Sequence, residues 1–407
     1  MKKILIVSYY FAPLNNIAAK RFGTMCKYFE KYGYEAYILT TRPHLHCSEN
    51  AQMDLEVPIP DERIIRIGRT GTAYKPASAW AQIALQFIEK RNMQSRALTE
   101  LALGWYEKVK EELNLNLVKD MDIVIGKYPG MENLLVARYI SRKLKCPFVA
   151  DIRDLITEYS EDAGARQRSF KLDSFVERFV LWRASGLVPV TCGFRDILMR
   201  KYPKKKMRVI FNGWECSGVN TKAQREHYLY YAGSLYAHRL ESFELLMRCL
   251  KQVVEVMDIR MIIRSIGPRG LDERMRRMIQ DEGMESYIEI REAANGTVVR
   301  EEQHKAYMNV VLSSVHPEDQ ALMTTVPGKL YEVLSENAPV LAVVPESSDV
   351  AKIVRRTNKG LASISEKKIV KFILNGEKDF PGNKYVKFFS REKQAERYCE
   401  FLDSIRK

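Results

Sequence analysis

The sequence contains no long hydrophobic segment. No apolar run in its 407 residues approaches the roughly 20 residues that a helix needs to cross a bilayer. Lys2 and Lys3 precede the apolar run Ile4–Val7, as in a signal peptide, but this run is short and polar Ser8 follows it. We therefore expect a first buried strand and a cytoplasmic protein, with contact to the inner face of the cell membrane left open.

Histidine and paired cysteine are scarce as well. The six histidines form no His-x-x-x-His pair, and the seven scattered cysteines contain no Cys-x-x-Cys, which indicates reduced thiols and no zinc site. An Asp-x-Asp at Asp120–Asp122 precedes a buried strand and so lies at the edge of a parallel sheet that does not bind ligands. We predict no bound metal and no other cofactor.

Two glycine-rich nucleotide motifs are incomplete. Gly267–Gly270 lacks the third glycine of a dinucleotide fingerprint. Leu330 follows Gly328 and Lys329, where a P-loop has Ser or Thr. These absences argue against a dehydrogenase and against a nucleoside triphosphatase.

Acidic residues are outnumbered, with 51 Asp and Glu against 65 Lys and Arg and a formal net charge of +14. This excess favours an anionic partner, such as nucleic acid, an acidic membrane leaflet or a phosphorylated substrate. The densest basic cluster, Arg200–Arg208, is typical of a solvated loop and carries no nucleic-acid-binding signature. We expect no nucleic-acid partner. The amphipathic segment Trp80–Arg96 is interpreted first as a core-facing helix, with membrane-surface contact as the alternative.

Strands and helices alternate along the whole chain. This alternation predicts parallel sheets covered by helices on both faces, and the length exceeds that of one ordinary core. We expect two tandem Rossmann-like doubly wound domains, at residues 1–215 and 216–387, with a C-terminal helix at 388–407 packing back on the first. Their functional residues should face a cleft at the carboxyl ends of the strands.

The segment Met323–Pro345 is the most informative part of the chain. Gly328 and Lys329 open a predicted helix, Glu332 follows one turn later, and a buried strand comes next. A helix N-terminus with a lysine suits a diphosphate, and a carboxylate one turn on suits ribose hydroxyls. The alternative is an ordinary surface ion pair, worth only a few tenths of a kcal/mol.

Five short segments together resemble GT-B fold glycosyltransferases, particularly the glycosyltransferase family 4-like group of bacterial cell-surface glycan synthesis. The segments are ILIVSYYFAPLNN at 4–16, VADIRD at 149–154, FNG at 211–213, YAGSLY at 231–236 and PGKLYE at 327–332.

The resemblance implies that the C-terminal domain binds a nucleoside-diphosphate-sugar and that the N-terminal domain binds the acceptor. The donor-binding residues that it implies are Gly233, Ser234, Arg239, Thr325, Gly328, Lys329, Leu330 and Glu332. For the acceptor it implies Asn15, Asn16, Arg21 and Lys127, and for catalysis Asp151, Arg153, Asp154 and Thr324.

The sequence departs from the family pattern at two places. Asn15 and Asn16 replace the paired glycines of many relatives, and Thr324 stands where many members carry a second glutamate. A hydroxyl of Thr324 or Thr325 could replace that glutamate, as could nearby Glu318 or Asp319. The Asp-Arg pair near residue 151 could equally brace a loop.

We read the chain as a glycosyltransferase that moves a sugar from a nucleoside diphosphate to a glycan or lipid-linked acceptor. Retention of configuration and independence of metal are further expectations. A nucleotide-sugar epimerase or hydrolase, and a non-catalytic nucleotide-sugar-binding protein, are the alternatives.

Overall fold

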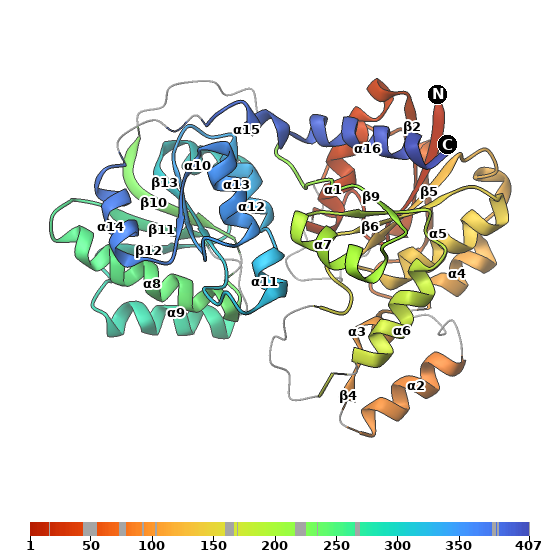
Figure 1. Cartoon of the computed structure of the whole chain (residues 1–407), viewed down its shortest axis with the longest axis horizontal. Coiled ribbons are helices and arrows are strands. Elements are labelled where there is room, and N and C mark those ends of the chain that lie inside the picture. Colours follow the sequence, from red (N-terminus) through yellow and green to blue (C-terminus); the bar gives the residue numbers. More distant parts are fainter. Residues whose placement is uncertain are drawn as a thin grey trace. The chain divides into compact units, whose positions relative to one another are not determined.

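Figure 1 shows a computed structural model of the chain, which forms two compact units. Unit 1 comprises Met1–Phe211 and Arg391–Lys407, and unit 2 comprises Asn212–Ser390. The structure describes residues 1–406 except 16, 44–54, 73–78, 92, 102–103, 159–166, 169, 216–224, 234, 265–268, 377–379 and 381.

Unit 1 is built on a seven-stranded sheet with the order β3-β2-β1-β5-β6-β8-β9, in which all neighbouring strands are parallel. The strand order reverses between β1 and β5, as in a doubly wound fold. The strands are β1 (Lys2–Val7), β2 (Tyr34–Arg42), β3 (Ile64–Arg69), β5 (Ile123–Tyr128), β6 (Phe148–Ile152), β8 (Gly186–Pro189) and β9 (Lys206–Met207). A separate short pair joins β4 (Met93–Gln94) to β7 (Gln167–Arg168).

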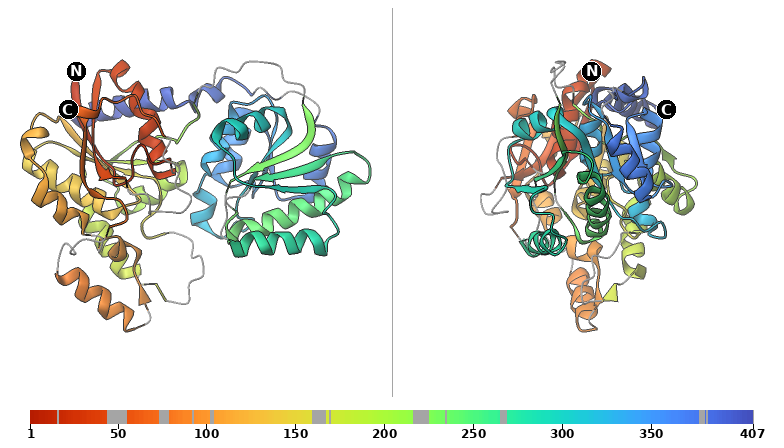
Figure 2. Two further views of the ribbon diagram at one scale, coloured as in Figure 1. Left: turned by 180° about the vertical axis from the view of Figure 1, so that it is seen from behind. Right: turned by 90° about the vertical axis from the view of Figure 1, so that its left-hand side faces the viewer.

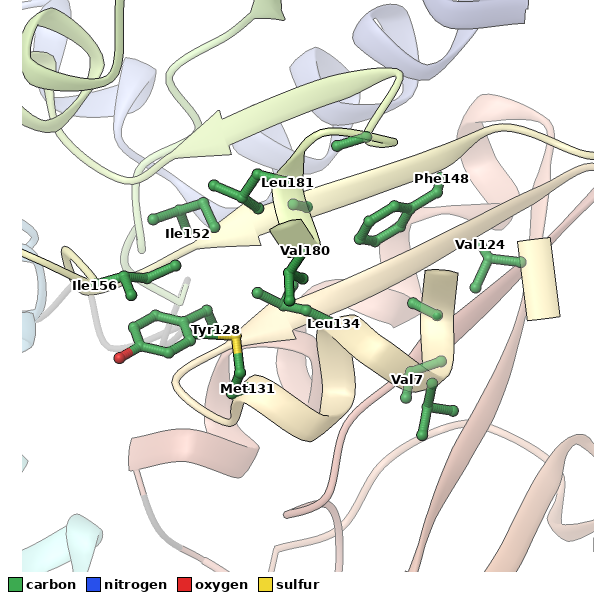
Figure 3. Packing of buried hydrophobic residues seen from close by; sticks show 14 of the residues in the cluster. Val7, Val124, Tyr128, Met131, Leu134, Phe148, Ile152, Ile156, Val180 and Leu181 are labelled. Atoms are coloured by element: carbon green, nitrogen blue, oxygen red, sulfur yellow. The ribbon is translucent and has the colours of Figure 1, made fainter. Parts of the chain in front are cut away.

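Helices cover both faces of this sheet because successive strand residues point to opposite sides. Val7, Val124 and Phe148 belong to the cluster on one face, which Figure 3 shows together with residues of α5 and α6. Ile4 and Ile125 belong to the cluster on the other face, with residues of α1 and α16. The helices are α1 (Ile17–Met25), α2 (Ala79–Glu89), α3 (Arg96–Leu101), α4 (Trp105–Glu112), α5 (Met131–Leu144), α6 (Phe170–Leu181), α7 (Cys192–Lys201) and α16 (Arg391–Arg406).

Unit 2 repeats the architecture with a six-stranded parallel sheet in the order β12-β11-β10-β13-β14-β15. The strands are β10 (Glu226–Ala232), β11 (Arg260–Arg264), β12 (Ile288–Arg291), β13 (Ala306–Leu312), β14 (Val340–Val343) and β15 (Gly360–Ser363). The helices are α8 (Ala237–Val254), α9 (Arg269–Asp281), α10 (Gly296–Lys305), α11 (Gln320–Thr324), α12 (Gly328–Leu334), α13 (Asp349–Thr357), α14 (Glu366–Leu374) and α15 (Tyr385–Phe388). The expected pair of Rossmann-like α/β domains is confirmed.

Three segments differ from what their local sequence predicts. The segment 208–213, whose apolar Val209, Ile210 and Phe211 predict a strand, does not form one, although Ile210 still donates its N–H to the carbonyl of Pro189. The apolar stripe through residues 98–113, which predicts one amphipathic segment, is divided into α3 and α4 by Gly104, whose φ is +76°. Among the α2 side chains that the structure describes, Ile88 alone is buried, whereas Ile83 and Phe87 are exposed, so this helix does not turn its whole apolar stripe to the core. The side chain of Trp80 lies outside the described residues.

Within the described part of the chain, no helix is both long and apolar enough to cross a membrane.

Candidate functional site

The carboxyl edge of the unit 2 sheet brings together three of the predicted donor residues. Gly233 follows directly after β10, and Arg239 lies in the first turn of α8. Lys329, almost a hundred residues further on, returns to the same place from α12, because a Cβ on residue 233 would lie 2.9 Å from its Nζ. The strand order reverses between β10 and β13, which is where open α/β sheets bind their ligands.

The ammonium group of Lys329 is buried, and no described carboxylate pairs with it. Its Nζ has no hydrogen-bond partner among the residues that the structure describes, and lies 3.6 Å from the centroid of the Tyr231 ring. Burial lowers the pKa of Lys329 well below its ordinary value, the charge of Arg239 lowers it further, and Glu332 opposes both. Because an isolated buried ammonium is costly, this arrangement favours an anion that would approach it.

Position 233 requires glycine, both for its backbone conformation and for the limited space beside it. Its φ is +124°, which side chains other than hydrogen rarely tolerate. Any Cβ there would also press on the Lys329 side chain, 2.9 Å from Nζ and 3.1 Å from Cε. The missing side chain therefore leaves room for the lysine and for a ligand close to the backbone.

Arg239 adds a second cation to this edge. It is only 8% exposed, and its guanidinium lies 4.8 Å from the centroid of the Tyr236 ring. Burial raises the pKa of Tyr231, and the charge of Arg239 and a hydrogen bond from it act in the opposite direction. The N-terminal end of the 18-residue α8 adds the positive end of a helix dipole, which favours an anion at this edge.

The other predicted donor residues take different positions. Glu332 is exposed on α12, where its carboxylate can reach a ligand, and Gly328 is exposed at the start of the same helix. The Leu330 side chain is fully buried in the core, so only its backbone can face a ligand. Ser234 lies outside the described residues.

The two threonines hydrogen-bond to their own helix. Thr324 donates to the carbonyls of Gln320 and Ala321, at 2.9 and 3.1 Å, and Thr325 donates to Ala321 at 2.8 Å. Asp319 is used as the N-cap of α11, where its carboxylate accepts the N–H of Leu322 at 2.9 Å. Neither hydroxyl nor Asp319 is held ready as a replacement for the missing glutamate.

Sequence reasoning missed a histidine between two carboxylates at the same sheet edge. His316, which follows β13, lies 2.5 Å from Glu241 of α8 through Nε2 and 3.1 Å from Glu318 through Nδ1. Burial lowers the pKa of His316, but the two carboxylates outweigh it and the net shift is upward. No local motif links residues 241 and 316, so only the fold reveals this cluster.

In unit 1, Asp151 and Arg21 form a fully buried ion pair. Arg21 donates from Nε to Oδ1 at 3.0 Å and from Nη2 to Oδ2 at 2.9 Å. It also donates to the carbonyls of Phe211 and Ile210. Asp151 is 0% exposed and Arg21 3% exposed, so the pair braces β6 against α1 and the segment after β9. This bracing is the structural role expected from the sequence as the alternative for Asp151, but its partner is Arg21 rather than Arg153.

Two further cations surround this pair. Lys127 is completely buried at the end of β5, and its Nζ donates to the carbonyl of Ala18 at 2.6 Å. Burial and then the charge of Arg153 lower the pKa of Lys127 well below its usual range, and Asp151 opposes them. Arg153 has a buried Nε with no partner among the described residues, and burial lowers its pKa.

The remaining unit 1 candidates are more accessible. The Asp154 side chain is 47% exposed and lies 3.9 Å from Arg96. Asn15 is half-buried, and Asn16 lies outside the described residues. Asp154 is therefore the predicted catalytic carboxylate of this unit that solvent and ligands can reach.

Asp122 has a structural role at the amino end of β5. Its carboxylate accepts the N–H of Lys3 at 2.7 Å and pairs with Arg406 at 2.9 Å. Among the described residues, no group of three or more His, Cys, Asp or Glu side chains is placed to hold a metal ion.

Comparison with known proteins identifies solved structures that share this fold. No protein-family model and no curated protein matches the sequence. A mutant of Staphylococcus aureus TarM, solved with fondaparinux, alpha-GlcNAc-glycerol and UDP, is 11% identical, with a TM-score of 0.62 over 99% of this chain and 100% of that one. Sucrose-phosphate synthase from Thermosynechococcus elongatus is 12% identical, with a TM-score of 0.60 over 100% and 96%.

A putative UDP-N-acetylglucosamine 2-epimerase from Listeria monocytogenes is also similar, at 12% identity and a TM-score of 0.53 over 99% of this chain and 96% of that one. At such low identities these likenesses show the fold, which is the GT-B fold expected from the sequence.

Proposed function

We propose that the protein is a glycosyltransferase that moves a sugar from a nucleoside-diphosphate-sugar to a glycan or lipid-linked acceptor. The observation that carries the proposal is the buried Lys329 ammonium beside Gly233 and Arg239, at the switch point of the unit 2 sheet. Its support is the GT-B fold, which the chain shares with TarM, a protein solved with bound UDP.

The proposed chemistry assigns the leaving group to the two cations of unit 2. Charge accumulates on the departing diphosphate in the transition state, and fixed cations that face it lower the barrier. Lys329 and Arg239 supply this charge, and the N-terminal end of α8 adds the positive end of its helix dipole. Transfer by this route needs no metal, and we propose that it retains the configuration of the sugar.

Recognition of the nucleoside falls to Glu332. Its exposed carboxylate is one helical turn from Lys329, so it can accept hydrogen bonds from the two ribose hydroxyls while Lys329 contacts the phosphates. Thr325 and the backbone of Gly328 and Leu330 complete the proposed donor site.

Acceptor binding belongs to unit 1 in this proposal. Asp154 is the accessible carboxylate after β6, and we assign it the contact with the acceptor hydroxyl. Lys127, Arg153 and the buried Asp151 pair hold the strand ends from which Asp154 and the Asn15 loop extend. Arg21 and Lys127 thus act as positioning residues, without contact to the acceptor.

The proposed location is the cytoplasm, at the inner face of the cell membrane, where lipid-linked acceptors are found. The exposed Ile83 and Phe87 of α2 support this, since Arg91 lies 3.5 Å over the Phe87 ring and combines charge with apolar surface.

The binding experiment is calorimetric titration of UDP, GDP and ADP, without metal, into the wild type and Glu332→Ala. We expect one nucleotide to bind in the micromolar range and to lose about tenfold in affinity, or about 1.4 kcal/mol, in the variant. Failure of all three nucleotides to bind a folded protein would refute the donor site.

The activity experiment separates the transferase from its two alternatives. The matching nucleotide-sugar is incubated with and without a panel of lipid-linked acceptors. A transferase consumes the donor only when the acceptor is present. An epimerase, which the Listeria likeness keeps as a candidate, converts the sugar without any acceptor. A nucleotide-sugar-binding protein without catalysis leaves the donor intact in both cases.

A further inference from the structure

Four cations line a pocket of about 350 Å³ in unit 1. Arg138, Arg142 and Lys145 come from α5 and its C-terminal cap, and Arg183 follows α6. Phe148, the first residue of β6, also lines the pocket. The pocket therefore lies at the amino edge of the sheet, opposite the edge that carries Arg153 and Asp154, and is separate from the proposed catalytic residues.

The four cations of this pocket have no acidic partner in the part of the chain that the structure describes. No carboxylate there forms an ion pair with any of them, whereas Lys108, Lys110 and Arg264 each pair with a glutamate. Burial lowers the pKa of Arg138, and the charges of Arg142 and Arg183 lower it further, so the three arginines repel one another.

The backbone holds this repulsive cluster in place. Arg138 donates from Nη1 to the carbonyl of Phe179 at 2.9 Å, which ties α5 to α6. α5 ends with Lys145 in the left-handed conformation, at a φ of +55°, and the negative end of a helix dipole stabilises nearby cations. The cluster can therefore form before any ligand binds, and its guanidinium groups offer the paired donors that match phosphate oxygens.

An exposed aromatic ridge adjoins the pocket along α6. Phe175 is 61% exposed and Phe179 49%, and their spacing places them on one face of α6; Trp182, which is 71% exposed, directly follows the last residue of the helix, Leu181. The ridge and the pocket are continuous, because the guanidinium of Arg138 lies 4.1 Å over the Phe179 ring and Arg183 follows Trp182 in the chain.

We propose that this surface, Arg138, Arg142, Lys145 and Arg183 with the α6 aromatic ridge, docks the protein on an anionic phospholipid surface. The pocket receives a headgroup phosphate while Phe175 and Trp182 enter the interface. The charge selects anionic lipid, and the exposed aromatic side chains favour a membrane over a soluble phosphate, since aromatic rings prefer the headgroup level. The site does not depend on the proposed transfer reaction, because docking needs neither donor nor acceptor.

The test is sedimentation of the full-length protein with vesicles of phosphatidylcholine alone, or with a third of the lipid replaced by phosphatidylglycerol. We expect binding only to the anionic vesicles. Arg142→Gln with Arg183→Gln should weaken it about tenfold or more, as lost surface cations predict. Phe175→Ser with Trp182→Ser should weaken it as well, and because both side chains are exposed, the melting temperature should stay unchanged.

The matched control is Arg274→Gln with Arg277→Gln, which removes the same charge from exposed positions of α9 in unit 2. It should leave vesicle binding nearly unchanged. Equal losses in the control and the pocket variant would indicate diffuse attraction and overturn the proposal.

Two further experiments test whether a soluble anion or helix α2 accounts for the binding. Titration with inorganic pyrophosphate tests a soluble anion: pocket-dependent pyrophosphate binding without vesicle binding would overturn the membrane assignment. Ile83→Ser with Phe87→Ser tests α2. Loss of vesicle binding in this variant, with the pocket variant unaffected, would move the docking surface to α2 and refute the α6 pocket. Figures 1 and 2 show α2 and α6 at the same end of unit 1.

Discussion

Gly233 and Lys329 are fitted to each other in the structure, because any Cβ on residue 233 would lie 2.9 Å from the lysine Nζ. Gly233→Ala should therefore displace the ammonium from its place over Tyr231. We expect nucleoside diphosphate affinity to fall about tenfold or more, an energy of about 1.4 kcal/mol. The positive φ should also lower the free energy of unfolding by roughly 1 kcal/mol.

The matched control for this variant is Gly296→Ala. Gly296 opens α10 in unit 2, and no atom lies within 4 Å of its hypothetical Cβ. It should bind the nucleotide as the wild type does. Wild-type affinity in Gly233→Ala would show that the space beside Lys329 is not used by the ligand.

Nucleotide binding should take up a proton at alkaline pH. Burial holds the pKa of Lys329 well below its ordinary value of 10.5, and a bound diphosphate would raise it again. Nucleotide affinity is therefore highest at pH values where Lys329 is protonated in both the free and the bound protein. It falls as the pH rises through the lowered pKa of Lys329 in the free protein. Calorimetry in buffers with different ionisation enthalpies measures the uptake. A binding enthalpy that is the same in all buffers between pH 7 and 10.5 would contradict this prediction.

Asp151 should contribute mainly to the stability of the folded protein. Asp151→Asn leaves the buried Arg21 charge without its partner, which typically costs about 3–5 kcal/mol. Arg21→Met with Asp151→Leu should recover much of this loss, because it removes both charges. Urea unfolding measures the free energies. Asp154→Asn, at the half-exposed neighbour, should keep wild-type stability and lose transfer activity. Unchanged stability in Asp151→Asn would contradict the bracing role.

Glu132 should make unit 1 more stable at acidic than at neutral pH. Burial raises the pKa of its carboxyl to about 7 from the ordinary 4.5, while its Oε2 accepts the N–H of Trp105 at 2.9 Å. The folded state holds this proton more tightly than the unfolded state. The stabilisation that follows from this tighter proton binding is complete below pH 4.5. It is on the order of 2 kcal/mol and is lost as the pH rises through about 7. Glu132→Gln cannot ionise and should flatten this part of the stability profile, measured by urea unfolding from pH 4.5 to 8.

The strand and helix pattern could be predicted because it depends on local periodicity. The alternation of apolar runs indicated parallel sheets, and Gly328 was correctly expected to open a helix before the strand β14. The break at Gly104 and the missing strand at 208–213 were not foreseen, since neighbouring apolar residues continue both patterns.

The site was only partly predictable because burial and long-range contacts decide it. The sequence offered Lys329 and Glu332 as a surface pair or as donor ligands, but gave no sign that Tyr231 would lie under the ammonium. The Arg21–Asp151 pair joins residues 130 positions apart, and His316, after β13, contacts Glu241 of α8. Such contacts follow from the topology of the sheets rather than from spacing along the chain.

The central claim is that Lys329 contacts a diphosphate. The most direct test is titration of UDP, GDP and ADP into Lys329→Met, with its melting temperature measured alongside. The account predicts that the nucleotide bound by the wild type loses about tenfold or more in affinity. The melting temperature should stay equal or rise, because an unpaired buried ammonium is replaced by an apolar side chain. Wild-type affinity in a folded Lys329→Met variant would contradict the account.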